Sequence, residues 1–182
     1  GNSLYVFGGD GGNRNLGALY RLDISPPGSG LPSKWPDLSA IPLAPDARRA
    51  HTLVYHAGQL IIFGGRGSKF RLNDVHAFDI AAGSWHEIDC GGDGPSPRGF
   101  ASAVVHGSRM VIFGGLSEEC LNDVYQLELP DGSHPTPGSS RRYPRLGASL
   151  GKLFEEGLFA DVRIVLGGGS KTISAHKAIL AS

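Results

Sequence analysis

The sequence predicts a mainly all-β fold, followed by a short α/β segment at the C-terminal end. The 182-residue chain places many of its 28 glycines and 12 prolines between short apolar runs, which is typical of turn-rich β proteins. An apolar run ending in Phe-Gly-Gly occurs three times, at residues 4–9, 60–65 and 110–115. After residue 149 the pattern changes to helical spacing of apolar residues and then to strand alternation.

The three copies keep the same internal spacing. The second glycines of the three pairs are 56 and 50 residues apart. Fourteen residues separate Gly9 from Asp23, and the same number separates Gly65 from Asp79. The six additional residues of the first copy fall in one loop rich in proline and glycine, at residues 24–34. A repeat of about fifty residues therefore organises the chain.

Each copy is expected to form four short strands. The second strand of each copy is continuously apolar, which is the mark of a strand covered on both faces. Links at 57–59 and 107–109 carry glycine where a hairpin turn needs a positive φ. The third copy has no counterpart of Trp35 and Trp85, so its outer strand is left open. The expected strands are 4–7, 18–23 and a partial one around Trp35 in the first copy, 51–55, 60–63, 74–79 and one around Trp85 in the second, and 101–105, 111–113 and 123–128 in the third.

Four shared motifs carry a resemblance to a known family: Phe-Gly-Gly, Leu-Asn-Asp-Val, a tryptophan and Pro-x-x-Arg. This combination is similar to the kelch repeat, and the resemblance covers residues 1–129. It implies a partial kelch β-propeller of about two and a half four-stranded blades, whereas propellers close with about 4–8 blades. We therefore expect exposed apolar faces on the end blades, and poor solubility or association of the isolated chain. Gly1 is not a start methionine and residues 1–9 begin partway through a repeat, so we also expect an internal piece of a longer protein.

Residues 130–145 and 146–182 differ from the repeats. The first segment combines proline, glycine and serine without apolar periodicity, and it is expected to be a linker without a packed element. The second predicts a short helix near residues 150–156, a hairpin pairing 161–166 with 171–174, and a second helix from residue 175. Its phrases Phe-x-Asp-Val and Ala-His-Lys-x-x-Leu resemble the opening of a BTB (POZ) domain.

The resemblance to a BTB domain carries three polar residues with it. Asp161, His176 and Lys177 match characteristic polar positions of that family. The resemblance places the aspartate and the lysine near an interface between paired subunits. Helix capping and solvation of a strand end are the equally weighted alternative.

Charge and cysteine content limit the classes of partner and compartment. Seventeen basic and seventeen acidic residues give a formal net charge of +0, which argues against a nucleic-acid or membrane-surface partner. No apolar run reaches the ~18 residues of a membrane helix. Cys90 and Cys120 form no C-x-x-C pair and are expected to be free thiols in a reducing compartment. This favours a cytoplasmic protein, with the nucleus also open.

No catalytic, cofactor or metal site is predicted. The segment GGGSKT at 167–172 has Ser170 where a phosphate loop needs glycine before the lysine, so a glycine hairpin is favoured. The Phe-Gly-Gly pairs recur in each copy and are assigned to backbone conformation. None of the seven histidines shows ligand spacing. Arg48 and Arg98 hold equal positions in their copies and are expected to form hydrogen bonds within their blades.

The loops between the second and third strands are the candidate binding site. The loop at 66–71 is basic, the loop at 116–120 is acidic, and the loop at 10–15 is mixed. Variable loops on a constant frame are typical of recognition surfaces. The resemblance places them on one face with the links around 41–47 and 89–97, and the insertion on the opposite face. We hypothesise that five charged residues contact a protein partner, against an equal expectation of ordinary solvated charge: Arg66, Lys69, Arg71, Glu118 and Glu119.

The function that the resemblance implies is protein–protein interaction without catalysis. A kelch and BTB combination implies a substrate adaptor, in which the propeller binds a client and the complete BTB domain self-associates and docks on a cullin-based ubiquitin ligase. The order, kelch before BTB, is similar to a minority of that family. Two alternatives stay open. One is a scaffold that binds the cytoskeleton or a small GTPase, and the other is a propeller enzyme of the copper oxidase or sugar isomerase type, for which the sequence shows no Tyr/His/Cys cluster.

Overall fold

Every regular element in the described part of the chain is a β-strand. The computed structural model describes residues 3–24, 36–38, 41–89 and 94–129, and further along only the backbone of three short strands. The strands are β1 (Ser3–Asp10), β2 (Asn15–Asp23), β3 (Thr52–His56), β4 (Gln59–Arg66), β5 (Arg71–Asp79), β6 (Ser84–Glu87), β7 (Ser102–His106), β8 (Arg109–Leu116), β9 (Cys120–Glu128), β10 (Ser140–Arg142), β11 (Val162–Leu166) and β12 (Lys171–Ala175).

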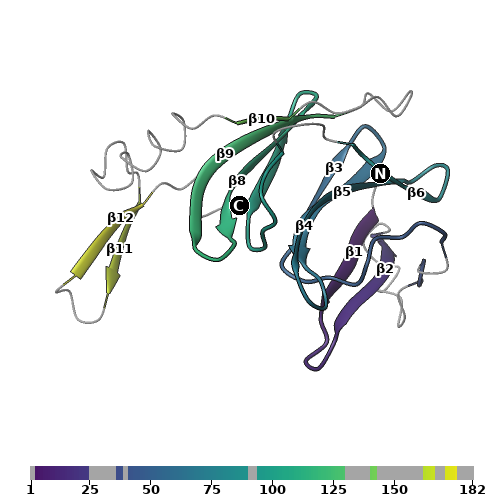
Figure 1. Cartoon of the computed structure of the whole chain (residues 1–182), viewed down its shortest axis with the longest axis horizontal. Coiled ribbons are helices and arrows are strands. Elements are labelled where there is room, and N and C mark those ends of the chain that lie inside the picture. Colours follow the sequence, from purple (N-terminus) through teal and green to yellow (C-terminus); the bar gives the residue numbers. More distant parts are fainter. Residues whose placement is uncertain are drawn as a thin grey trace.

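The repeats fold into three antiparallel sheets that follow one another along the chain (Figure 1). We call each sheet a blade. Blade 2 has the order β3-β4-β5-β6, and blade 3 has the order β7-β8-β9-β10. Blade 1 consists of β1 and β2, with Asp37 forming an isolated bridge to Tyr20 of β2 at the place of the expected outer strand. The innermost strands β3 and β7 contact each other. The predicted four-stranded unit is confirmed in blades 2 and 3, whereas blade 1 has two strands among the described residues.

Strand β4 is buried on both faces, as its continuous apolar sequence predicts. Leu60 and Ile62 point towards blade 1, into a cluster that includes Phe7 of blade 1 and Trp85 of blade 2. Ile61 and Phe63 point into a second cluster with residues of blade 3, which includes Met110, Ile112 and Leu127. Because side chains alternate along a strand, one strand contributes to both interfaces between blades.

The Phe-Gly-Gly pairs adopt a backbone that suits glycine. In blade 2, Gly64 and Gly65 have φ values of 60° and 100°, and the register of β4 against β5 shifts between Phe63 and Gly65. An ideal Cβ on Gly64 would lie 2.8 Å from the carbonyl oxygen of Arg98, which belongs to the link that enters blade 3. Any larger residue would push this link away, so the predicted structural role of the pair is confirmed.

The expectation of no packed element in residues 130–145 is wrong in one place. Ser140–Arg142 forms β10, which pairs with β9 and supplies the outer strand of blade 3. An edge strand needs only backbone hydrogen bonds along one side, so it does not require the apolar periodicity on which the expectation was based.

The hairpin predicted in the tail is present. Strands β11 and β12 are antiparallel, with Val162 opposite Ala175 and Leu166 opposite Lys171. The two expected helices of this segment, and Asp161, His176 and Lys177, lie outside the described residues. Most of the insertion at 24–34 also lies outside them.

The outward faces of the two end blades are more exposed than their equivalents in blade 2. Val6 in β1 is 42% exposed, whereas the equivalent Ile62 is 0% exposed. Phe113 in β8 is 38% exposed, whereas the equivalent Phe63 is 1% exposed. Each position is covered where a neighbouring blade is present, so burial here depends on the neighbour rather than on the blade itself.

We therefore expect the isolated chain to associate in solution. Replacing Val6, Val104 and Phe113 together by threonine keeps residues that favour strands but removes apolar surface from both end faces. Analytical ultracentrifugation should show self-association of the parent chain and a shift of the variant towards monomer. A monomeric parent chain that unfolds cooperatively would contradict the expectation.

Candidate protein-binding surface

Arg48 joins two neighbouring blades. Its guanidinium is buried in blade 2, where Nη1 donates to the carbonyl oxygen of Gly64 at 3.0 Å and the two Nη atoms donate to Asp74 at 2.7 and 2.8 Å. Its backbone bonds to blade 1, because its carbonyl oxygen accepts from Gly9 N at 2.9 Å and its N–H donates to the Leu16 carbonyl oxygen at 3.0 Å. One residue therefore fixes the link between the blades through both its side chain and its backbone.

Arg98 repeats this arrangement between blades 2 and 3. Its side chain donates to Gly114 O and to both carboxylate oxygens of Asp123, and its backbone bonds to Gly65 and Leu72. The guanidinium also lies 5.3 Å from the ring centroid of Tyr125. The prediction that both arginines form hydrogen bonds within their blades is confirmed. The sequence did not show that their backbones also hold the preceding blade.

The three loops between second and third strands share one face with the links that enter blades 2 and 3. Arg49 and Arg66 exchange two backbone hydrogen bonds, at 3.1 and 2.7 Å. Asn15 Nδ2 donates to Arg66 O at 2.8 Å, which connects the loop of blade 1 to that of blade 2. Gly99 and Leu116 form the equivalent backbone bridge in blade 3. We call this surface the loop face, formed by residues 10–15, 41–50, 66–71, 94–100 and 116–120.

The five predicted contact residues all lie on the loop face. Arg66, Lys69, Glu118 and Glu119 are exposed, and Arg71 is partly exposed. None of the five forms an ion pair with another residue in the described part of the chain. Their charges are thus available to a partner. Whether a partner uses them stays a prediction.

Three apolar side chains on the same face were not identified from the sequence. Leu43, Phe70 and Phe100 are 78%, 75% and 70% exposed, which makes them the most exposed large apolar residues in the described chain. Leu43 and Phe100 also have φ values of 62° and 57°. Bulky residues rarely adopt this backbone, and such strain is concentrated at functional positions. The available signal was the replacement of Ala50, which has the same backbone, by Phe100 in the third copy.

Comparisons with known proteins agree with this repeated geometry. Residues 1–146 match the family model described as the KLHDC2/KLHL20/DRC7 Kelch-repeats domain. The chain belongs to the kelch-repeat family. A kelch-repeat domain implies protein–protein interaction.

Three relatives from different organisms are similar to this chain. The leucine-zipper-like transcriptional regulator 1 homolog of Drosophila melanogaster is 29% identical over 100% of this chain and 18% of its own length. Kelch domain-containing protein 3 of Rattus norvegicus is 31% identical over 70% of the chain and 35% of its length. The dynein alpha chain of the flagellar outer arm of Chlamydomonas reinhardtii is 32% identical over 70% of the chain and 3% of its length. The chain therefore spans about a third or less of each of these relatives.

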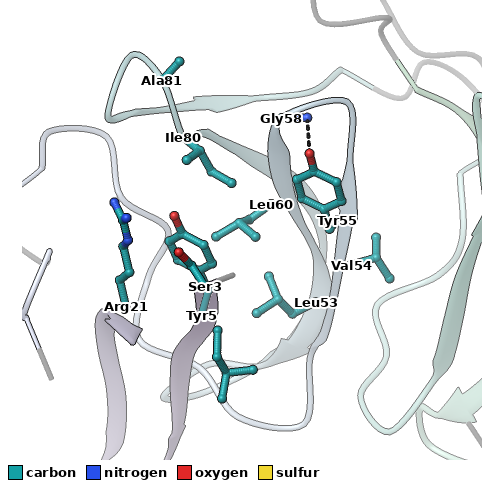
Figure 2. Close-up of a pocket in the computed structure, with 11 residues that line it drawn as sticks. Ser3, Tyr5, Arg21, Leu53, Val54, Tyr55, Gly58, Leu60, Ile80 and Ala81 are labelled. Atoms are coloured by element: carbon teal, nitrogen blue, oxygen red, sulfur yellow. Dashed lines mark hydrogen bonds between the residues drawn. The ribbon is translucent and has the colours of Figure 1, made fainter. Parts of the chain in front are cut away.

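A cavity of about 690 Å³ lies between kelch blades 1 and 2 and was also missed by sequence reasoning. Figure 2 shows Tyr5 of β1 on one side, with Leu53 of β3 and Leu60 of β4 on the other. In blade 2 the innermost strand β3 pairs with one edge of β4, and in blade 3 β7 pairs with the same edge of β8. The equivalent edge of β1 has no partner among the described residues. We interpret the cavity as the space beside an unpaired strand edge.

The described residues contain neither a candidate metal site nor a helix that could span a membrane. No group of three or more His, Cys, Asp or Glu side chains could hold a metal ion there. No helix in this part is long and apolar enough to cross a membrane. Cys120 is a free, exposed thiol at the start of β9, whereas Cys90 lies outside the described residues.

Two titratable groups near Arg48 have shifted pKa values. Burial, followed by the positive charge of Arg48, lowers the pKa of His51 to about 4, although a hydrogen bond with the Phe7 backbone acts in the opposite direction. Burial acts to raise the pKa of Asp74, but hydrogen bonds from His76 and Arg48, together with their charges, hold it well below its usual range. Asp74 therefore remains the ionised partner of Arg48 at neutral pH.

Removing the buried guanidinium should separate the blades. We expect Arg48→Met to lower the free energy of unfolding by about 3 kcal/mol, because it leaves the Asp74 carboxylate without its main partner. Urea denaturation measures this change. Arg49→Met is the matched control, since Arg49 forms only a surface ion pair with Asp10 at 3.1 Å and should cost less than about 1 kcal/mol. Equal losses in the two variants would contradict the role of Arg48.

His51 should make the folded chain sensitive to mild acid. Its pKa is lowered in the folded state from 6.5 to about 4, so the unfolded state binds more protons between these values. The contribution of neutral His51 to the free energy of unfolding should be fully present above pH 6.5. The free energy of unfolding should fall by about 2 kcal/mol as the pH approaches 4, after allowance for partial exposure of the ring. Urea titrations across this range should show the slope. His51→Ala, which introduces the residue found at the equivalent Ala101 of the third repeat, should remove this slope. An unchanged slope would contradict its attribution to His51.

Proposed function

We propose that this chain binds a protein partner through its loop face. The observation that carries the proposal is the combination of exposed apolar side chains and unpaired charges on one face of a rigid frame. Phe70 and Phe100 supply the large aromatic surface that dominates binding energies at interfaces. Arg66 and Lys69 supply charge that can orient a partner and speed its association.

We further propose that the parent protein is a substrate adaptor of a cullin-based ubiquitin ligase. The tail resembles the opening of a BTB domain, and its backbone contains the hairpin that this resemblance requires, at β11 and β12. The alignment with the leucine-zipper-like regulator homolog runs over the whole chain, so the kelch segment and this tail occur in the same order in that relative. In this proposal the loop face binds the client, and a complete BTB domain self-associates and docks on the cullin.

A scaffold function is the second candidate. The dynein alpha chain of the flagellar outer arm contains a segment that is similar to the repeats of this chain. A parent protein of this kind would bind a cytoskeletal protein or a small GTPase through the same face without engaging a ligase. In either case the free thiol of Cys120 suits a reducing compartment, and we place the protein in the cytoplasm or the nucleus.

Affinity capture with the full-length parent protein separates these candidates. We expect the adaptor to recover a cullin together with a client protein. Recovery of a cytoskeletal protein or a GTPase without a cullin would favour the scaffold.

The loop face itself is tested by reversing its basic charges. The triple variant Arg66→Glu, Lys69→Glu and Arg71→Glu should lose at least about ten-fold in client recovery, because a steering charge becomes repulsive. Arg109→Glu is the matched control, because Arg109 lies at the opposite end of its strand, next to the turn between β7 and β8. Client recovery that is the same for the triple variant and the parent would remove the loop charges from the proposal.

A further inference from the structure

Three arginines form a row across neighbouring segments of the loop face. Arg49 lies opposite Arg66 in an isolated antiparallel bridge, and Arg66 lies opposite Arg71 in the ladder between β4 and β5. Directly opposed residues of antiparallel segments project from the same side, with Cβ atoms about 5 Å apart. The three guanidinium groups therefore start from adjacent positions on one side of the blade. We call these three residues the arginine row.

The positive charge of the arginine row is only partly neutralised by the rest of the described chain. Arg49 has one acidic partner, Asp10, at 3.1 Å. Arg66 and Arg71 have no ion pair with any described residue. Like charges directly opposite each other on a sheet destabilise the folded state. The frame thus holds two uncompensated cations side by side, at a cost that an anionic ligand would remove.

The row is not a requirement of the kelch frame. The equivalent positions in blade 3 are Gly99, Leu116 and Cys120, which form the same bridge and the same ladder pair without any charge. In blade 1 the corresponding ladder pair is Asp10 with Asn15. Three copies of one backbone with three different side-chain sets show that the fold tolerates other residues here. The positive charge of blade 2 therefore needs an explanation outside folding.

We propose that the arginine row binds the oxyanions of an acidic peptide segment on the partner protein. A guanidinium can donate two parallel hydrogen bonds to a carboxylate or a phosphate, and two adjacent guanidinium groups can hold successive acidic groups or one doubly charged phosphate. Phe70 lies beside Arg71 in the chain, is 75% exposed, and offers apolar contact to the residues that flank the acidic group. The inference rests on the proposed function of the loop face and specifies the chemistry of its partner.

Asp10 sets the strength of the site. Its Oδ1 accepts from Gly12 N at 2.9 Å and shapes the loop of blade 1, while its Oδ2 pairs with Arg49. An asparagine could keep the first interaction through its side-chain carbonyl and would lose the negative charge. Asp10→Asn should therefore release Arg49 to the ligand and strengthen binding, which is an outcome that a merely structural arginine row would not produce.

The test uses the full chain against arrays of short synthetic peptides of varied sequence, in one set with unmodified side chains and in another with phosphoserine. We expect bound peptides to be enriched in Asp and Glu, in phosphoserine, or in both, and the two sets distinguish carboxylate from phosphate. Arg66→Gln with Arg71→Gln should reduce this preference at least about ten-fold and should raise the melting temperature by about 1–3 °C, since it removes like-charge repulsion. Asp10→Asn should increase the preference, and Arg109→Gln should leave it unchanged.

Two results would overturn the inference. One is an array in which acidic and neutral peptides bind the parent chain equally. The other is a preference for acidic peptides that survives in the Arg66→Gln, Arg71→Gln variant. The arginine row could fail this test while the loop face still binds the client. Client capture with the full-length protein distinguishes these two cases. Loss of the client with Phe70→Ala and Phe100→Ala, but not with the arginine variant, would leave the loop face as the binding surface and remove the arginine row from it.

Discussion

The structure depends on an arginine that belongs to two blades at once. The side chain of Arg48 is held by Asp74 and Gly64 in its own blade, while its backbone bonds to Gly9 and Leu16 in the blade before it. A buried guanidinium is stable only when nearly all of its donors are satisfied, so this geometry tolerates little displacement. The consequence is that the orientation of each blade relative to the next is set at the loop face, next to the candidate site, and the apolar clusters fill the space below it.

Arg48 and Arg98 fix the backbone of the loop face. Arg49 follows Arg48 directly, and Phe100 follows Arg98 by two residues. Their backbones are therefore placed by buried hydrogen bonds even though their side chains face solvent. This explains how a phenylalanine can be kept at a positive φ with a mostly exposed ring, because the surrounding bonds over-determine its backbone. Binding residues on such a support lose little conformational freedom when a partner arrives.

The frame could be predicted from the sequence, whereas much of the binding surface could not. The spacing of Gly9, Gly65 and Gly115 and the continuous apolar second strands determine the blades, because they report backbone conformation and burial of a single repeat. The charged loop residues were found because they depart from a constant pattern.

Arg49 was missed because its position opposite Arg66 arises from hydrogen bonding between two segments that are seventeen residues apart in the chain. Exposure of Phe70 was missed because an aromatic residue in a sequence is expected to be buried. Strand β10 was missed because pairing at a sheet edge leaves no mark in side-chain periodicity.

A repeat protein provides its own comparison between positions that serve the fold and positions that serve something else. Arg48 and Arg98 have the same partners in two blades, and the glycine pairs have the same backbone in three, so these residues are explained by folding alone. At the arginine row the backbone pairing is again the same, but the side chains change from Asp and Asn in blade 1 to arginine in blade 2 and to Leu and Cys in blade 3. Equal backbone energetics with unequal side chains means that folding does not select the arginines, and their mutual repulsion means that folding is weakened by them. A residue set that the frame neither needs nor favours is best explained by what it binds.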